Sequence, residues 1–321
     1  MIFERKATTK DKFKDLFVLR KMSAFNTYVT TWGTASQSQD PLAVVQDMAA
    51  KQAITPNTTI MLAFASFNFD SSDYIPGFNN LTIEKVQQII GVVHGHGGKV
   101  SLSVGGATYP FYGSDLYFRP GDLAVNINGI VKKCGFDGVD FDIEDSYANV
   151  PSDFATQAAS LINTLRSLNT GLYLTLTTPA QAWGAGMYQQ KLLNLTIGNI
   201  NAWQPMEYDL WIDPNNTYPQ QIQSDLTFYT TKWGVNPSKI VLGLMPGNDD
   251  MSHDLTLQSA LNLTSFAMGM GCGGVMTWDA NLDLGGVDGN ASYAFIKGIQ
   301  SMLGKCKPSR CRKRKEHPKS I

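Results

Sequence analysis

Apolar and β-branched residues gather in eight short segments along the chain, and each segment is followed by a stretch long enough for a helix. The segments begin 30 to 40 residues apart, at 28–32, 60–64, 100–104, 138–142, 172–176, 202–206, 240–244 and 274–278. Between them, stretches such as 82–97 and 155–169 carry apolar residues at helical spacing. This alternation predicts eight β–α units, the repeat of a parallel α/β fold.

Two folds are built from such units, and a phosphate-binding motif helps to separate them. A doubly wound open sheet that binds a dinucleotide would carry G-x-G-x-x-G directly after a strand. Neither Gly105-Gly106 nor the stretch 95–98 supplies it. We therefore predict an α/β fold, a (β/α)8 TIM barrel with a single catalytic domain over 22–304. The active site of such a barrel lies at the C-terminal ends of its strands.

The fourth strand carries an acidic pattern. The stretch GFDGVDFDIED alternates apolar with acidic side chains, in the order Val139, Asp140, Phe141, Asp142, Ile143 and Glu144. Because side chains alternate along a strand, the three acids share one face. The apolar residues suit the layer of helices, so we expect the acids to point into the barrel, with Glu144 nearest its mouth.

Three carboxyl groups so close together cannot all ionise at low cost. A shared proton and a raised pKa are expected, and a carboxylic acid with a raised pKa suits general acid catalysis. Two other interpretations fit the pattern less well. A surface loop would not interleave Val, Phe and Ile, and calcium-binding loops place Gly and polar residues between their ligands. We expect no metal and no cofactor.

Strands six and eight supply further candidate residues. Gln204, Met206 and Tyr208 follow one another at period two and so share a face, with Asp209 one step further on. Trp278 ends strand eight, where its flat indole suits stacking on a sugar ring as well as packing in the core. These side chains are therefore expected near the acids.

The motifs resemble those of family-18 glycoside hydrolases, the chitinase family. The stretch 137–144 (DGVDFDIE) matches the motif D-G-x-D-x-D-x-E, and 101–106 (SLSVGG) matches the strand-three motif S-x-G-G. The stretch 204–209 (QPMEYD) resembles the strand-six motif, and Trp278 resembles the strand-eight tryptophan. The resemblance covers roughly residues 24–302 in the expected order.

The resemblance implies an endochitinase that hydrolyses β-1,4 linkages between N-acetylglucosamine units of chitin with retention, and so degrades a polysaccharide. The substrate's own 2-acetamido carbonyl would be the nucleophile and would form an oxazolinium ion. Glu144 would be the general acid/base, assisted by Asp142, Asp140 and Tyr208. The implied substrate-binding residues are Trp278, Gln204, Met206, Asp209, Tyr28, Gly105, Gly106 and Phe67.

One departure from the family concerns the loop after strand seven, where many members carry an α+β insertion. Here only about 30 residues separate the segments 240–244 and 274–278, so an open groove and cleavage within chains are expected. Two alternatives are an endo-β-N-acetylglucosaminidase of N-glycan chitobiose cores and a non-hydrolytic chitinase-like lectin. The presence of Glu144, the last acid of the motif, favours a hydrolase over a lectin. A linear polysaccharide is favoured by the aromatic residues Trp32, Phe67, Tyr109, Trp183 and Trp211.

The formal charge of −1 is unevenly distributed. Residues 305–321 contribute +7 and residues 1–21 contribute +4, which leaves −12 for 22–304. An acidic body does not suggest nucleic-acid binding in the catalytic role. We expect a basic N-terminal extension and a basic, disordered C-terminal tail; a tail that contacts an anionic surface is the less favoured interpretation.

The cysteine content and the first residues bear on the cellular compartment. Four cysteines are too few for a disulfide framework, and whether Cys306 and Cys311 pair stays open. The first residues lack the apolar stretch of about 7–15 residues that marks a secretory signal, whereas chitin as a substrate suggests an extracellular location. The chain has no apolar run long enough for a membrane span. We expect a monomer that binds chitin or chitooligosaccharides.

Overall fold

The computed structural model describes residues 24–32, 40–69, 74–78, 81–146, 148–180 and 187–304. The two basic segments predicted at 1–21 and 305–321 lie outside the described residues, as do Trp183, Cys306 and Cys311. Among the residues that the structure describes, no helix is both long and apolar enough to cross a membrane.

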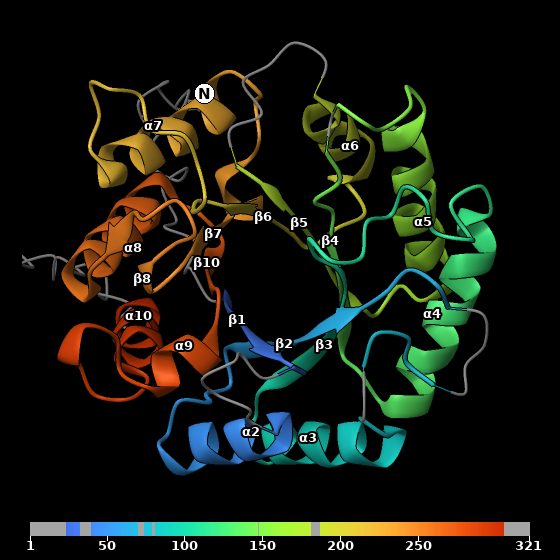
Figure 1. Ribbon diagram of the computed structural model, residues 1–321, viewed down its shortest axis with the longest axis horizontal. Coiled ribbons are helices and arrows are strands. Elements are labelled where there is room, and N and C mark those ends of the chain that lie inside the picture. Colours follow the sequence, from blue (N-terminus) through green and yellow to red (C-terminus); the bar gives the residue numbers. More distant parts are fainter. Residues whose placement is uncertain are drawn as a thin grey trace, which may run out of the picture.

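Eight parallel strands close into a barrel, and helices surround it as an outer ring (Figure 1). The order around the barrel is β1-β10-β7-β6-β5-β4-β3-β2. The strands are β1 (Ala24–Thr30), β2 (Thr58–Ala65), β3 (Lys99–Gly105), β4 (Gly138–Asp142), β5 (Tyr173–Pro179), β6 (Ala202–Met206), β7 (Val241–Leu244) and β10 (Gly274–Thr277). The predicted (β/α)8 barrel is confirmed, although the first strand begins at Ala24, four residues before the predicted start.

Some of the helices combine a side-chain cap at their first turn with an apolar stripe. In α3 (Ile83–Gly95), the Thr82 side chain accepts a hydrogen bond from the backbone N–H of Lys85, and the buried residues recur at helical spacing. The other helices of the ring are α2 (Pro41–Ala50), α4 (Pro120–Cys134), α5 (Phe154–Leu168), α6 (Tyr188–Thr196), α7 (Tyr218–Thr231), α8 (Leu257–Met270), α9 (Ala280–Leu284) and α10 (Ala294–Gly304). Two short 3-10 helices, η1 (Pro237–Lys239) and η2 (Val287–Gly289), complete the set.

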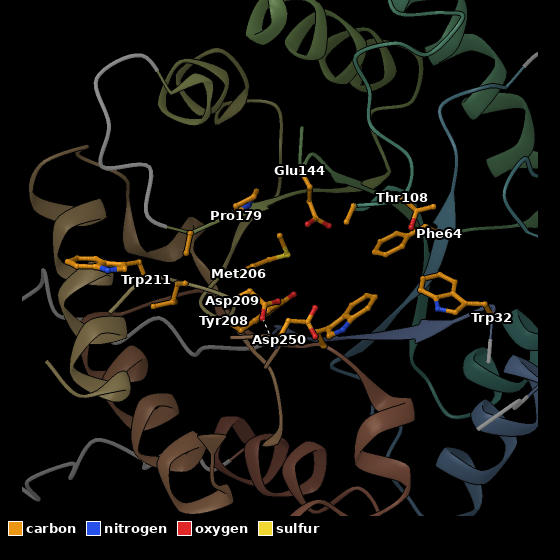
Figure 2. A pocket seen from close by; sticks show the side chains of 14 residues that line it. Trp32, Phe64, Thr108, Glu144, Pro179, Met206, Tyr208, Asp209, Trp211 and Asp250 are labelled. Carbon is orange, nitrogen blue, oxygen red and sulfur yellow. Dashed lines mark hydrogen bonds between the residues drawn. The ribbon is translucent and has the colours of Figure 1, made fainter. Parts of the chain in front are cut away.

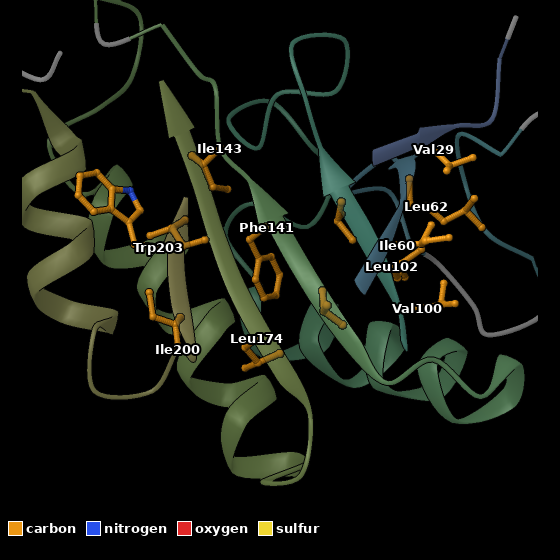
Figure 3. Packing of buried hydrophobic residues seen from close by; sticks show 14 of the residues in the cluster. Val29, Ile60, Leu62, Val100, Leu102, Phe141, Ile143, Leu174, Ile200 and Trp203 are labelled. Carbon is orange, nitrogen blue, oxygen red and sulfur yellow. The ribbon is translucent and has the colours of Figure 1, made fainter. Parts of the chain in front are cut away.

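The apolar residues form two clusters on opposite sides of the strand wall. The larger cluster fills the space between strands and helices, and Figure 3 shows part of it, including Phe141 and Ile143 of the acidic stretch. Val139, Phe141 and Ile143 are at most 1% exposed in this cluster. The smaller cluster lies inside the barrel and includes Tyr28 and Met206. The alternation read from the fourth strand is therefore confirmed: its apolar face meets the helices.

Strand β2 departs from simple alternation. Its pairing with β3 shifts register between Leu62 and Ala65. As a result the consecutive residues Ala63 and Phe64 both belong to the interior cluster, whereas Phe67 belongs to the outer one. A one-residue shift moves every later side chain to the opposite face of the sheet.

The connection between β7 and β10, all of which is described, contains no separate domain. It consists of a two-stranded antiparallel sheet, β8 (Gly247–Asn248) and β9 (Asp254–Leu255), followed by α8. This hairpin lies beside the residues that follow β6. The contact is a hydrogen bond from the backbone N–H of Asp209 to the carboxylate of Asp249. The insertion that the sequence lacks is therefore replaced by a short loop at the mouth of the barrel.

Candidate active site

A cavity of about 380 Å³ opens at the C-terminal ends of the strands. In Figure 2, Glu144 points into it, and Trp32 and Trp211 lie on opposite sides. Its lining residues are Trp32, Phe64, Ala107, Thr108, Glu144, Pro179, Ala180, Met206, Tyr208, Asp209, Leu210, Trp211, Asp250 and Trp278. The place is the one expected for the active site of a TIM barrel.

Asp140 lies deepest of the three acids and is surrounded by hydrogen-bond donors. One of its oxygens accepts from the hydroxyl groups of Tyr28 (2.7 Å) and Ser103 (2.8 Å). The other accepts from the hydroxyl groups of Thr175 (2.6 Å) and Thr177 (2.9 Å). Burial raises the pKa of Asp140, and these hydrogen bonds oppose the rise. Four hydroxyl groups directed at the Asp140 carboxyl group favour its ionised form.

Asp142 lies between the other two acids and is poorly compensated. Its side chain is buried, and no described residue donates a hydrogen bond to its Oδ1 atom. Burial, followed by repulsion from Glu144 and Asp140, holds the pKa of Asp142 well above its usual range. The surroundings of Asp142 therefore favour its protonated form, as expected for acids that share a proton.

Glu144 follows β4 and carries its carboxyl group into the cavity (Figure 2). Burial raises its pKa to about 7; a backbone hydrogen bond at Ala107 lowers it, and the charges of Asp209 and Asp145 raise it. The backbone at this point is anchored, since the Tyr188 hydroxyl donates to the Ile143 carbonyl at 3.1 Å. A carboxylic acid that is half protonated near neutral pH fits a group that must give and take a proton.

The floor of the cavity is aromatic. The rings of Phe64 and Trp278 are stacked, with centroids 5.5 Å apart and planes 11° apart. The Trp32 ring also stacks on Phe64 at 5.7 Å and lies 6.5 Å from Trp278, and the Tyr28 ring meets Trp278 edge-on at 5.1 Å. Because these rings fix one another, Trp278 presents a rigid apolar surface of the kind on which sugar rings stack.

Two glycines make room for this floor and for β4. A side chain at Gly106 would place its Cβ atom 2.6 Å from the Phe64 ring, and one at Gly105 would place it 2.0 Å from the Asp142 carbonyl oxygen. Both residues also have positive φ angles, +117° and +74° for Gly105 and Gly106. The pair thus serves close packing around the acids.

Tyr208 and Asp209 follow β6 after Glu207 and line the cavity. The Tyr208 side chain is 6% exposed, and its hydroxyl has no hydrogen-bond partner among the described residues. A buried hydroxyl without a partner costs free energy unless a ligand or water satisfies it. Asp209 has a positive φ of 52°, and its carboxylate accepts from the backbone N–H of Asp250 at 2.6 Å.

The structure brings some of the predicted site residues to the cavity and leaves others out. Glu144, Tyr208, Met206, Asp209 and Trp278 line it. Asp140 and Asp142 lie beneath it, and so does Gln204, whose amide nitrogen donates to Thr177 at 2.8 Å and approaches Asp140 at 3.3 Å. Tyr28 supports Trp278 and Asp140 from below.

Gln204 and Tyr28, also predicted to contact substrate, thus lie below the lining, and three further residues of that set lie elsewhere. Phe67 is 1% exposed in the outer core, where its ring lies 5.1 Å from that of Phe111. The register shift in β2 turns it away from the barrel. Gly105 and Gly106 act by making room and do not line the cavity.

Sequence reasoning missed Phe64, Thr108 and Asp250 as lining residues. Alternation along 60–64 puts Phe64 on the outer face, and only the register shift brings it to the mouth. A signal for Phe64 was present in Gly106, since a Gly-Gly pair at a strand end indicates close approach of another group. Asp250 lies on the β8–β9 hairpin, which no motif predicted.

The fold and the site thus define a closed parallel barrel with three acids of one strand at and below its mouth. The sequence profile of the family described as "Glycosyl hydrolases family 18" matches residues 25–254. The chain therefore belongs to glycosyl hydrolase family 18, and the resemblance read from its motifs is confirmed. None of the curated proteins compared with the chain matches it.

Solved structures show the same fold at low sequence identity. A GH18 chitinase from Pseudoalteromonas aurantia has a TM-score of 0.65 and 22% identity, over 87% of this chain and 99% of that one. A catalytic-site mutant of active domain 2 of the Pyrococcus furiosus chitinase, complexed with chito-oligosaccharides, has a TM-score of 0.63 and 18% identity, over 89% and 97%. The Ostrinia furnacalis Group IV chitinase in complex with allosamidin has a TM-score of 0.66 and 16% identity, over 88% and 98%.

Proposed function

We propose that this protein is an endochitinase that hydrolyses β-1,4 linkages between N-acetylglucosamine units with retention of configuration. The observation that carries the proposal is the position of Glu144, a carboxyl group with a pKa raised to about 7 at the mouth of the barrel, directly above the Asp142 and Asp140 side chains. The family and the chito-oligosaccharide complex of a structural relative support the choice of substrate.

In the first step, protonated Glu144 gives its proton to the glycosidic oxygen and the leaving sugar departs. The carbonyl oxygen of the substrate's own 2-acetamido group attacks C1 from the opposite face, and an oxazolinium ion forms. The Asp142 carboxylate accepts the hydrogen bond of the acetamido N–H and stabilises the positive charge, while Asp140 helps to set where the remaining proton of the three acids lies.

The aromatic floor and Tyr208 hold the reacting sugar. Trp278 lies under the ring, and the Tyr208 hydroxyl, which is buried and unpaired with any described residue, donates to the acetamido oxygen. In the second step the Glu144 carboxylate removes a proton from water, which attacks C1 on the side that the leaving group vacated. Met206 and Asp209 contact the same sugar from β6.

The N-acetyl group is chemically necessary in this scheme, and that provides the test. Turnover of fully N-acetylated chitooligosaccharides should exceed that of fully deacetylated chitosan oligomers of equal length by at least about a hundredfold, because the nucleophile is lost. Equal rates on both substrates would contradict the proposal. Chromatography of the oligosaccharides released should show products of internal cleavage, and not only products cut from a chain end. Internal cleavage is expected for a groove without an insertion domain.

A comparison of chitooligosaccharides with an N-glycosylated protein as substrates separates the two alternatives. Release of intact N-glycans from a glycoprotein, without cleavage of chitooligosaccharides, would indicate an endo-β-N-acetylglucosaminidase. Binding of chitooligosaccharides without any turnover would indicate a lectin.

A further inference from the structure

Two side chains from different elements hold the two peptide groups that flank Tyr208. The Tyr218 hydroxyl, at the start of α7, donates to the carbonyl oxygen of Glu207 at 2.9 Å. The Asp249 carboxylate, on the β8–β9 hairpin, accepts from the backbone N–H of Asp209 at 2.8 Å. β6 ends at Met206, and the last bond from this segment to the sheet runs from the backbone N–H of Glu207 to the Gly243 carbonyl of β7 at 3.1 Å, just before these two peptide groups.

His253 joins these two side chains to each other. Its Nδ1 atom lies 2.9 Å from Oδ2 of Asp249, and its ring lies 5.1 Å from the Tyr218 ring with planes 30° apart. Because an ionised carboxylate only accepts hydrogen bonds, the imidazole donates here. Tyr218, Asp249 and His253 thus form one connected unit, which we call the Tyr208 clamp.

Asp249 is the rigid member of the clamp. Its side chain is 0% exposed. Besides Asp209 and the imidazole, it accepts from the backbone N–H groups of Met251 (3.0 Å) and His253 (2.8 Å). A carboxylate with this many donors has one fixed orientation, so it can hold Asp209 in the left-handed conformation that a residue with a side chain rarely adopts.

The Tyr208 ring packs in the interior cluster, but its hydroxyl is unpaired within the described part of the chain. No hydrogen bond therefore fixes the hydroxyl directly, and its position follows the ring and the backbone that carries it. A displacement of that backbone would move the hydroxyl away from a reacting group, and small displacements cost much rate.

We propose that Tyr218, Asp249 and His253 are positioning residues that set the direction of the Tyr208 hydroxyl and the Asp209 carboxylate for the reaction. The kinetic part of this inference rests on the proposed function. The structural part does not, because it concerns the backbone of residues 207–209 in the free protein.

The structural part is tested by amide hydrogen exchange at Asp209 without substrate. Replacement of His253 by Leu, or of Asp249 by Ala, should speed exchange of this amide at least about fivefold. His253→Asn keeps a donor near the Nδ1 position and should restore most of the protection. Tyr293→Phe is the matched control, since it removes another tyrosine hydroxyl bond of 3.1 Å, to Asp47, far from the cavity. Unchanged exchange in His253→Leu would overturn the clamp, and this variant decides the matter if Asp249→Ala does not fold.

The kinetic part is tested by a double-mutant cycle on N-acetylated chitooligosaccharides. Tyr218→Phe keeps the ring on His253 and removes only the hydroxyl, and it should lower kcat about tenfold with KM changed less than about twofold. In a Tyr208→Phe background the same replacement should lower kcat less than about twofold, since the hydroxyl to be positioned is gone.

The outcomes separate the two proposals. Additive losses in the cycle, or a loss in Tyr218→Phe no larger than in Tyr293→Phe, would overturn the positioning role while the enzyme remains active. If the unmodified protein does not turn over chitooligosaccharides at all, the proposed function fails and the positioning role with it. The exchange measurement still decides whether the clamp exists.

Discussion

The hydroxyl group of Tyr28 donates a 2.7 Å hydrogen bond to Oδ2 of Asp140, which links β1 to β4 through the interior of the barrel. Both side chains are 0% exposed. The bond favours the ionised form of Asp140, and that charge in turn raises the pKa of Asp142. Tyr28, which does not line the cavity, therefore influences the protonation of the acids on which the proposed catalysis by Glu144 would depend.

Replacement of Tyr28 by Phe should weaken this arrangement without disturbing the packing of the ring. Loss of a buried hydrogen bond to a charged group should lower the free energy of unfolding by about 1–3 kcal/mol, and kcat/KM should fall at least about tenfold as Asp140 takes up a proton more readily. Urea denaturation and steady-state kinetics measure the two effects.

The matched control for that variant is Tyr173→Phe. The Tyr173 hydroxyl, on β5, accepts a long bond of 3.4 Å from Asn26 on β1, across the barrel. If both variants lose the same small amount of activity, the Tyr28–Asp140 bond has no special part in the mechanism.

The pH dependence of activity follows from the pKa of Glu144. The general acid must be protonated, so kcat/KM should fall as pH rises through about 7, by a limiting factor of about ten per pH unit. Burial is the main cause of that pKa, and the charge of Asp209 adds to it. Asp209→Asn removes a negative charge, which makes ionisation of Glu144 easier and should move the alkaline limb to lower pH.

Asp122→Asn serves as the control for charge alone, because its side chain is 64% exposed on α4, outside the lining of the cavity. Its pH profile should coincide with that of the unmodified protein. A limb that stays in place in Asp209→Asn would show that the two carboxyl groups do not interact.

Gly106 and Gly135 both have positive φ angles but differ in the space around them, so a comparison of the two tests the packing at Gly106. An added Cβ atom at Gly106 meets the Phe64 ring at 2.6 Å, whereas at Gly135 no heavy atom lies within 4 Å. Gly135→Ala should cost about 1 kcal/mol of stability from backbone strain alone, and Gly106→Ala about 1–3 kcal/mol more. Thermal or urea unfolding measures the difference.

Gly106→Ala should also reduce kcat/KM, because Phe64 must move and Trp278 stacks on it. Equal stability and equal activity in the two variants would mean that the floor tolerates the displacement.

Most of the barrel and the centre of the site could be predicted because they follow local rules. The alternation from Val139 to Glu144 fixes which face of β4 carries the acids, whatever its neighbours are. The spacing of the eight apolar segments fixes the order of the units in the same way.

The errors arose where a side chain's direction depends on a partner far away in the sequence. The register shift in β2 reverses the faces of Phe64 and Phe67, and it is set by pairing with β3. Gln204 shares a face with Met206 as predicted, but Asp140 and Thr177 hold it below the cavity. The contact of Asp249 with Asp209 joins two loops, and no local pattern in either loop indicates it.

The central claim is that Glu144 transfers the proton, and the replacement Glu144→Gln tests it most directly. The amide keeps the size of the side chain but cannot donate as an acid. With soluble N-acetylated chitooligosaccharides, the variant should bind with a Kd within about threefold of the unmodified protein and unfold at a similar temperature. Its kcat should be lower by at least about a thousandfold. A variant that retains most of the turnover of the unmodified protein would contradict the mechanism.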